Sequence, residues 1–77
     1  MKIIVLLFGV LAEKAGAQRL ELENIEDLES LKDYFNVKYP EFKELSFRVS
    51  VNQELVCGNI KLSDGDELAL LPPFAGG

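Results

Sequence analysis

The residues best suited to do chemistry in this chain stand at its C-terminus, where the sequence ends in Gly76-Gly77. A chain that ends there presents a free α-carboxylate on Gly77. Two residues without a Cβ can thread a narrow channel or lie against another backbone. Pro72 and Pro73 favour an extended path for the segment before them. The segment 72–77 has no charged or polar side chain, so we expect a functional tail rather than a frayed end.

A carboxylate at the end of such a tail needs activation before it can carry a group, because it is a poor electrophile at neutral pH. A mixed anhydride with AMP, made by an enzyme that grips the tail, would activate it. Gly76 and Gly77 suit that step, because an activating site must surround the acyl carbon closely. The tail therefore indicates a substrate-like carrier whose partners are the catalysts.

The other side chains offer little catalytic chemistry. The sequence has no histidine and a single cysteine, Cys57, which excludes Ser-His and Cys-His pairs and the usual zinc and iron–sulfur sites. We interpret Cys57 as a small buried hydrophobe. An acidic cluster is interpreted as a solvated face with a helix cap rather than a metal site; it consists of Glu21, Glu23, Glu26, Asp27 and Glu29. A second acidic group, Asp64, Asp66 and Glu67, is assigned to turn chemistry. We expect no metal and no tightly bound cofactor.

Length and composition limit the fold and the partners. Seventy-seven residues with 48% hydrophobic side chains fit one small globular domain. The net charge of −5 argues against nucleic-acid binding, which needs a basic face. The apolar start, residues 1–12, is too short to span a bilayer and lacks a separate basic region, so it predicts a strand and no signal peptide. One cysteine excludes an internal disulfide and favours a cytoplasmic setting.

The first third of the chain predicts two strands. Lys2–Phe8 is a continuous apolar run and is expected to form a central strand covered on both faces. Residues 9–16 are expected to form a helical turn that ends at Gly16. Arg19–Glu23 alternates strictly, which is typical of a half-buried strand. The two strands are expected to pair as a hairpin with a long loop.

The middle of the chain predicts one helix. Leu28, Leu31, Phe35 and Tyr39 recur at helical spacing. Asp27 is the preferred N-cap, with Asn24 as the alternative, and Pro40 is expected to end the helix.

The last third predicts three more strands, over 47–51, 55–57 and 67–71, separated by turns at 52–54 and 63–66. A helix across one face of a small mixed sheet gives an α+β roll. If the first two strands form a hairpin and the last lies parallel to the first, the fold is a β-grasp. The expected organisation is a domain over 1–71 and an extended, flexible Gly-Gly tail over 72–77.

The sequence resembles a known family, the small subunit of molybdopterin synthase, over nearly its whole length. The resemblance rests on Phe8-Gly9, Leu11, Glu13 and Gly16, on the segment 51–56, on the turn and strand 62–69, and on the end Leu71–Gly77. The combination of an Asp-Gly-Asp-Glu turn, a strand, Pro-Pro and a terminal Gly-Gly at these spacings is specific.

The resemblance implies a ubiquitin-like β-grasp and a sulfur-carrier cycle in molybdenum cofactor biosynthesis. A ubiquitin-activating-like enzyme would adenylate the Gly77 carboxylate with ATP, and a sulfur-donor protein would convert it to a thiocarboxylate. The tail would then enter the large synthase subunit and give its sulfur to cyclic pyranopterin monophosphate, within a heterotetramer of two small and two large subunits. Gly77 would carry the sulfur. The partner-binding residues would be Leu71, Pro72, Pro73, Phe74, Ala75 and Gly76. The chain would be a sulfur-donating subunit with no catalytic side chains of its own.

Two other functions stay open. The first is a sulfur carrier for thiamin thiazole synthesis, a family that also ends in Gly-Gly but is usually shorter and lacks the Phe-Gly-x-Leu-x-Glu segment and the Pro-Pro pair. The second is a ubiquitin-like protein modifier or interaction module. A modifier would form isopeptide adducts, whereas an interaction module would tolerate the loss of Gly76 and Gly77.

Overall fold

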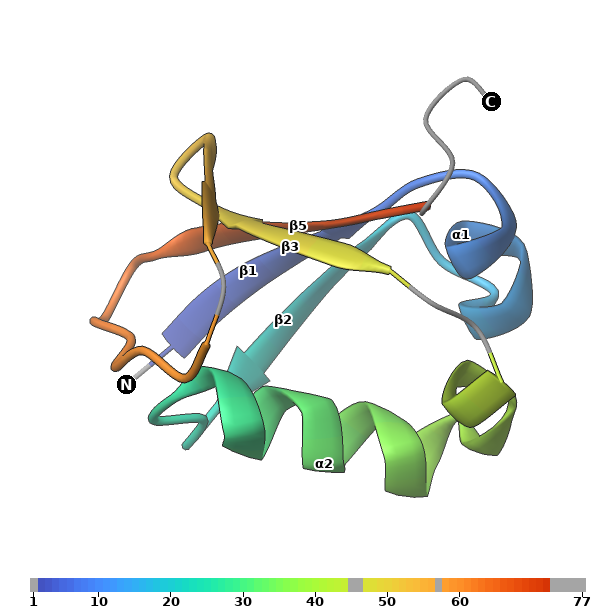
Figure 1. The fold of residues 1–77 in the computed structure, drawn as a ribbon, viewed down its shortest axis with the longest axis horizontal. Helices are drawn as coiled ribbons and strands as arrows, with labels where there is room; N and C mark the ends of the chain where they lie inside the picture. The colour runs from blue at the N-terminus through green and yellow to red at the C-terminus, as the bar shows by residue number, and fades with distance from the viewer. Residues whose placement is uncertain (1, 45–46, 57, 73–77) are drawn as a thin grey trace.

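The computed structural model describes residues 2–44, 47–56 and 58–72. Figure 1 shows its arrangement, a twisted sheet with one long helix beneath it and a short helix beside one end. The elements in chain order are β1 (Lys2–Leu7), α1 (Val10–Ala15), β2 (Arg19–Glu23), α2 (Leu28–Lys38), the 3₁₀ helix η1 (Pro40–Glu44), β3 (Arg48–Val51), β4 (Glu54–Val56) and β5 (Glu67–Leu71). No helix in the described ranges is long and apolar enough to cross a bilayer.

The five strands form one mixed sheet in the order β2-β1-β5-β3-β4. β1 pairs antiparallel with β2 and parallel with β5, and β3 pairs antiparallel with both β4 and β5. α2 crosses one face of this sheet (Figure 1). The hairpin of the first two strands and the parallel first and last strands are those of the β-grasp, so the predicted fold is confirmed.

The prediction that β1 is covered on both faces is wrong. Ile3, Val5 and Leu7 are buried on the side of α2, whereas Ile4 and Leu6 on the other side are only half-buried. No other described helix or strand lies over that second face. A continuous apolar run indicates burial on both sides of a strand only when a second layer is present. Here the run instead places apolar side chains on an open face.

The core lies between the sheet and α2 and is closed at one end by aromatic side chains. Leu28, Leu31 and Phe35 of α2 are buried, as their spacing predicts. α2 ends just before Pro40, but the chain continues directly into η1, which the sequence did not indicate. η1 brings the buried Phe42 against Phe35, with parallel rings whose centroids are 5.2 Å apart.

Asp27 is the N-cap of α2, as predicted, and its side chain accepts a hydrogen bond of 2.9 Å from the backbone N–H of Ser30. Residue Asn59 adds a second cap, because its side-chain oxygen accepts a hydrogen bond of 2.9 Å from the backbone N–H of Glu29. Asn24, the alternative cap, instead has a positive φ of 64° after β2. The start of α2 is therefore tied both to its own cap and to the segment before β5.

The β3–β4 hairpin is tighter than predicted. Asn52 and Gln53 both have positive φ and form a two-residue turn, so Glu54 belongs to β4 rather than to the turn. Two-residue hairpin turns with positive φ at both positions match the twist of the strands. Phe47 precedes β3 instead of starting it. Cys57 lies outside the described residues.

We predict that Phe35→Ala unfolds most of the protein at room temperature. Truncation of a buried Phe costs about 3–5 kcal/mol, and a domain of this size has a total stability of roughly 3–5 kcal/mol. Circular dichroism with urea titration measures the loss. Val37→Ala, on the same helix at a position that is 82% exposed, is the control and is expected to change stability by less than about 0.5 kcal/mol. Equal stability of the two variants would contradict the assigned core.

We also predict that Asp27 makes stability depend on pH. Hydrogen bonds from Ser30, and then from Asn59, hold the pKa of the Asp27 carboxyl below its ordinary value of 3.8. A group with a lowered pKa stabilises the folded state above its unfolded pKa, and this contribution disappears as the pH falls through the folded pKa. Asp27→Asn keeps a capping side chain but removes the charge. It is therefore expected to be less stable than the unmodified protein at neutral pH, with a gap that closes as the pH falls below 3.8.

Urea titrations at a series of pH values measure this gap. Asp33→Asn, at an exposed position on the same helix, is the matched control and is expected to leave stability within about 0.5 kcal/mol at neutral pH. A gap for Asp27→Asn that stays constant down to acid pH would show that the charge is not what stabilises the cap.

Candidate functional site

The candidate site starts at β5, which leads into the C-terminal tail from the centre of the sheet. β5 is paired on both sides, with β1 and with β3. Leu68 and Leu70 point into the core and are fully buried. A strand held by two neighbours and by a core is among the last parts of a small domain to open. The tail therefore leaves from a fixed base.

The start of β5 is held by the turn residues that the sequence singled out. The side-chain amide of Asn52 donates a hydrogen bond of 3.1 Å to Asp66, and its oxygen accepts one of 3.1 Å from the backbone N–H of Glu67. The other carboxylate oxygen of Asp66 accepts a bond of 2.8 Å from the N–H of Ser63. Asp66 therefore serves turn and strand geometry, as predicted.

The same turn is tied to β1. Asp64 accepts a hydrogen bond of 2.7 Å from the backbone N–H of Lys2, whose carbonyl accepts one of 2.7 Å from the N–H of Gly65. Gly65 has a positive φ of 88°, as the turn signal predicted. These bonds set the register of β5 against β1 and so decide where β5 ends.

The end of β5 lies against the loop after β1. The backbone N–H of Phe8 donates a hydrogen bond of 3.3 Å to the carbonyl of Leu70. Gly9 follows with φ 59° and ψ −134°. A Cβ placed on Gly9 would come within 2.8 Å of Cγ of Pro72, so the proline ring lies directly over the glycine.

Of the predicted site residues, the structure therefore places Leu71 and Pro72, both half-buried, at the end of β5. Pro73, Phe74, Ala75, Gly76 and Gly77 lie outside the described residues. Their predicted roles, and the extent of a tail over 72–77, stay predictions.

The sheet face opposite α2, which we call the open face, carries apolar side chains around the base of the tail, with Arg48 of β3 beside Leu71. Strand register places half-buried side chains side by side on it: Ile4, Leu6, Ala69 and Leu71. Phe8, at the end of β1, is 44% exposed, and Leu55 of β4 is 59% exposed. Contiguous apolar surface on a small protein marks an interaction site. The open face therefore fits a protein partner.

Charged side chains border the open face along β2. Glu21 forms ion pairs with Arg19 at 2.8 Å and with Lys2 at 3.4 Å. The hydrogen bonds from Arg19 and then Lys2 lower the pKa of the Glu21 carboxyl. These groups are exposed and pair with one another, so they form a solvated rim, as the sequence suggested for Glu21, rather than a metal site.

Two hollows adjoin the sheet. One, of about 550 Å³, lies beside the end of β1 and is lined by residues that include Leu6, Phe8, Gly9 and Arg19, so it continues the open face toward α1.

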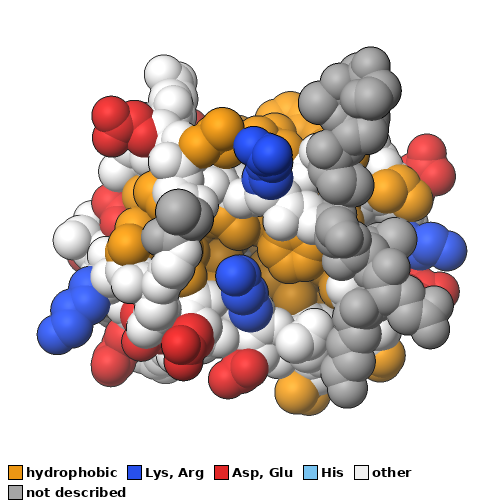
Figure 2. All heavy atoms as spheres, viewed as in Figure 1, with side chains coloured by type: hydrophobic (Ala, Val, Ile, Leu, Met, Phe, Trp, Pro, Cys, Tyr) orange, Lys and Arg blue, Asp and Glu red, His pale blue; other side chains and the backbone are white. Residues whose placement is uncertain are grey.

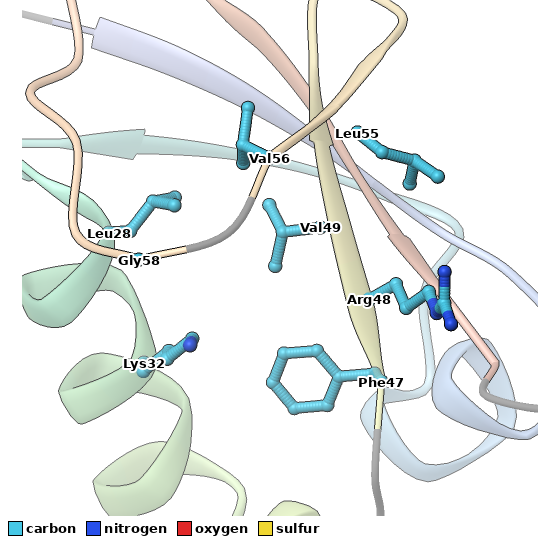
Figure 3. A pocket seen from close by; sticks show the side chains of 8 residues that line it. All are labelled: Leu28, Lys32, Phe47, Arg48, Val49, Leu55, Val56 and Gly58. Atoms are coloured by element: carbon cyan, nitrogen blue, oxygen red, sulfur yellow. The ribbon is translucent and has the colours of Figure 1, made fainter.

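The other hollow, of about 490 Å³, lies between α2 and β3. Figure 2 shows hydrophobic side chains at its bottom and basic side chains at its sides. In Figure 3, Phe47 and Val49 point toward α2, whereas Arg48 and Leu55 point away from it. None of the lining residues that the structure describes carries a carboxylate or hydroxyl group, so these residues offer packing surface rather than a catalytic set.

The described side chains form no catalytic centre. No group of three or more metal-ligating side chains occurs in the described ranges, and the whole sequence has no histidine. What the geometry provides is a rigid strand that presents a tail, with an apolar face beside it. This arrangement suits a protein that is bound and modified by others.

Comparison with known proteins gives the family. Residues 5–77 match the model of the ThiS family. The chain belongs to the ThiS family. This ThiS-family chain is 35% identical to the molybdopterin synthase sulfur carrier subunit of Mycobacterium tuberculosis, in an alignment of 82 residues that covers 100% of the chain and 99% of that protein. The resemblance to the molybdopterin synthase small subunit is thereby confirmed.

Solved structures are also similar to this ThiS-family chain. In a complex of subunits 1 and 2 of the molybdopterin-converting factor of Helicobacter pylori, the matching chain has a TM-score of 0.74 and 28% identity, with full coverage of both chains. The small archaeal modifier protein 1 of Haloferax volcanii has a TM-score of 0.80 and 25% identity, again with full coverage of both chains.

Sequence reasoning missed the contributions of Leu6, Phe8 and Gly9 to the site of this ThiS-family chain. Phe8 was assigned to the end of the first strand and Gly9 to the start of a helical turn, and both contributed to the family resemblance. Leu6 was assigned to a strand buried on both sides. An unbroken apolar run in a chain with a single helix large enough to cover a sheet was the available signal. One such helix covers one face, and the other face of the run must remain open.

Proposed function

We propose that this chain is the sulfur carrier subunit of a molybdopterin synthase, acting in molybdenum cofactor biosynthesis. The observation that carries the proposal is the identity with the Mycobacterium tuberculosis sulfur carrier over the full length of both chains. The position of β5 also supports the proposal, because β5 is paired on both sides. A carrier needs such a strand before its tail, so that the strand stays folded when a partner binds the tail.

The proposed chemistry takes place at Gly77 and is performed by partners. An oxygen of its carboxylate attacks the α-phosphorus of ATP, and pyrophosphate leaves. A hydrosulfide equivalent from a sulfur-donor protein then attacks the acyl carbon, AMP leaves, and Gly77 ends as a thiocarboxylate. ATP is bound by the adenylating, ubiquitin-activating-like enzyme, so the chain itself needs no cofactor.

The loaded tail then delivers its sulfur inside the large synthase subunit. The thiocarboxylate sulfur attacks a side-chain carbon of cyclic pyranopterin monophosphate and displaces an oxygen substituent of that carbon. Water then cleaves the bond between the acyl carbon and the sulfur, so that the pterin keeps the sulfur and Gly77 returns to a carboxylate. Each carrier delivers one sulfur and a dithiolene contains two. A heterotetramer of two small and two large subunits suits that count, and the cytoplasm is the proposed location.

The open face is the proposed docking surface for the large subunit. It surrounds the base of the tail, so one partner can bury the face and receive the tail together. The Helicobacter pylori protein is found in a complex with its subunit 2, which supports the same assembly here. Phe8 and Leu71 lie where the face and the tail meet.

A second candidate function is protein modification through isopeptide bonds from Gly77 to lysines. The similarity to the Haloferax volcanii modifier favours it, although the fold and the terminal glycines suit both functions. The thiamin thiazole carrier is disfavoured by the full-length match to a molybdopterin synthase subunit.

We predict that deletion of Gly77 abolishes sulfur loading and leaves the fold intact. The carboxylate would then end on Gly76 and stop one residue short of the adenylating site. Intact-mass measurement after incubation with the adenylating enzyme, ATP and a sulfur donor is expected to show one sulfur-for-oxygen exchange in the unmodified chain and none in the variant. Val37→Ala is the control and should load normally. Loading of the deletion variant, or lysine adducts instead of a thiocarboxylate, would contradict the proposal.

We predict that Phe8→Asp weakens binding of the large subunit by at least about tenfold, because it places a charge in an apolar interface. Calorimetric titration of the large subunit with each variant measures the affinity. Val37→Asp adds the same charge to α2, on the side of the molecule away from the open face, and is expected to bind normally. Equal affinity of the two variants would rule out the open face as the docking surface.

A further inference from the structure

We propose that Gly9 is a positioning residue that sets the direction in which the tail leaves the sheet. The Pro72 ring packs directly on Gly9, and we call this packing position the seat. The inference rests on the proposed function, since it concerns how the carboxylate of Gly77 reaches an activating site. Gly9 lies in a loop far from the tail in sequence and has no side chain of its own to take part in chemistry.

The contact between Gly9 and Pro72 leaves no room for a side chain. A Cβ on Gly9 would be 2.8 Å from Cγ of Pro72 and 3.9 Å from its Cδ. A separation of 2.8 Å between two carbons is well inside van der Waals contact. Any residue other than glycine must therefore displace the proline ring or the loop.

The loop is held on three sides, so the ring is the part that yields. Phe8 before the glycine is hydrogen-bonded to Leu70 of β5. The carbonyl of Gly9 accepts bonds from the backbone N–H groups of Ala12 at 3.1 Å and Glu13 at 3.3 Å, at the start of α1. Leu11 of α1 is fully buried in the core. Displacing Gly9 would disturb β5, α1 and the core together.

The other described glycines lack such a contact. Gly16, Gly58 and Gly65 also have positive φ, but a Cβ on any of them would meet nothing within 4 Å. At these three positions, glycine is favoured by the backbone conformation of the turn alone. Among the described glycines, the close approach to another segment is found at Gly9, and that segment is the base of the tail.

A small displacement at Pro72 is passed along the chain. Pro72 is followed by Pro73, and the fixed φ angles of two prolines transmit the direction of the first to the residues beyond it. The five residues after Pro72 can reach at most about 18 Å, which limits the distance between the ring and the terminal carboxylate. A misplacement of about 1 Å at a reacting centre can cost ~10²-fold in rate.

The test is a double-mutant cycle in the adenylation reaction, followed by pyrophosphate exchange with the adenylating enzyme. Gly9→Ala is expected to lower kcat roughly ten- to a hundredfold with little change in KM for the carrier, because the exposed side chains that a partner can contact are unchanged. Gly16→Ala introduces the same methyl group at a positive φ without the contact and is expected to stay within about threefold of the unmodified chain. It controls for the added methyl group alone, because Gly16 has a left-handed helical conformation (φ 74°, ψ 20°) and Gly9 does not (φ 59°, ψ −134°); the Pro72→Ala background controls for the backbone conformation of Gly9.

Pro72→Ala removes Cγ and Cδ, the two ring atoms nearest the Gly9 position. In that background Gly9→Ala is expected to cost less than about threefold, so that the two changes are strongly non-additive. Equal effects of Gly9→Ala with and without the Pro72 ring would overturn the proposal. A rise in KM at unchanged kcat would also overturn it, because it would place Gly9 in docking.

A partner-free measurement keeps this inference separate from the proposed function. Residual dipolar couplings of the Hα–Cα bonds of Leu71 and Pro72 report the direction of the tail base in the free protein. They are expected to change in Gly9→Ala and not in Gly16→Ala. Unchanged couplings in Gly9→Ala would overturn the proposed contact, whether or not the variant is loaded with sulfur. If the couplings change but the unmodified chain is never loaded with sulfur, the proposed function alone is overturned. If Gly9→Ala does not fold, unchanged couplings at Leu71 in Pro72→Ala would overturn the seat.

Discussion

The parallel pairing of β1 with β5 is the interaction on which the rest of this structure depends. It places the last strand between the first strand and β3, so that the C-terminal end of the chain emerges from the middle of the sheet. Parallel neighbours need a long connection, and here the intervening chain supplies β2, α2 and the β3–β4 hairpin, which together complete the core. The strand that leads to the C-terminal end of the chain is thus held by a neighbouring strand on each side.

This architecture separates stability from function in a very small domain. The side facing α2 holds the buried leucines and the stacked Phe35 and Phe42, which provide the cohesion. The opposite face keeps apolar side chains such as Leu6 half-buried and available. A domain of 77 residues has too few residues to cover both faces of its sheet by itself. The open face is then the surface that a protein partner can bury.

The described side chains form no catalytic centre, which agrees with this division. A carrier of the proposed kind would work in turn with an activating enzyme, a sulfur donor and a synthase subunit, so its reactive group would have to fit several sites. A carboxylate on two glycines fits narrow sites, and chemistry supplied by each partner avoids conflicting demands on one small protein. What the domain contributes is the position and direction of its tail, which are properties of β5, Pro72 and the loop at Gly9.

The sequence by itself determined the elements with strong local signals. The helix period of Leu28, Leu31 and Phe35, the Asp27 cap and the Gly65 turn correctly predicted α2 and the start of β5, because spacing and turn chemistry are local properties. The terminal Pro-Pro and Gly-Gly pairs, at their spacing from that turn, were enough to indicate the family.

Only the tertiary structure decided how the faces and the ends meet. η1 after Pro40 is stabilised by the packing of Phe42 against Phe35, and a local sequence pattern cannot show this contact. The half-exposure of Leu6 depends on which face α2 covers, since an apolar run looks the same whether one or two layers pack on it. The seat of Pro72 on Gly9 joins residues 63 positions apart, and a contact between distant segments is set by the fold rather than by neighbouring residues.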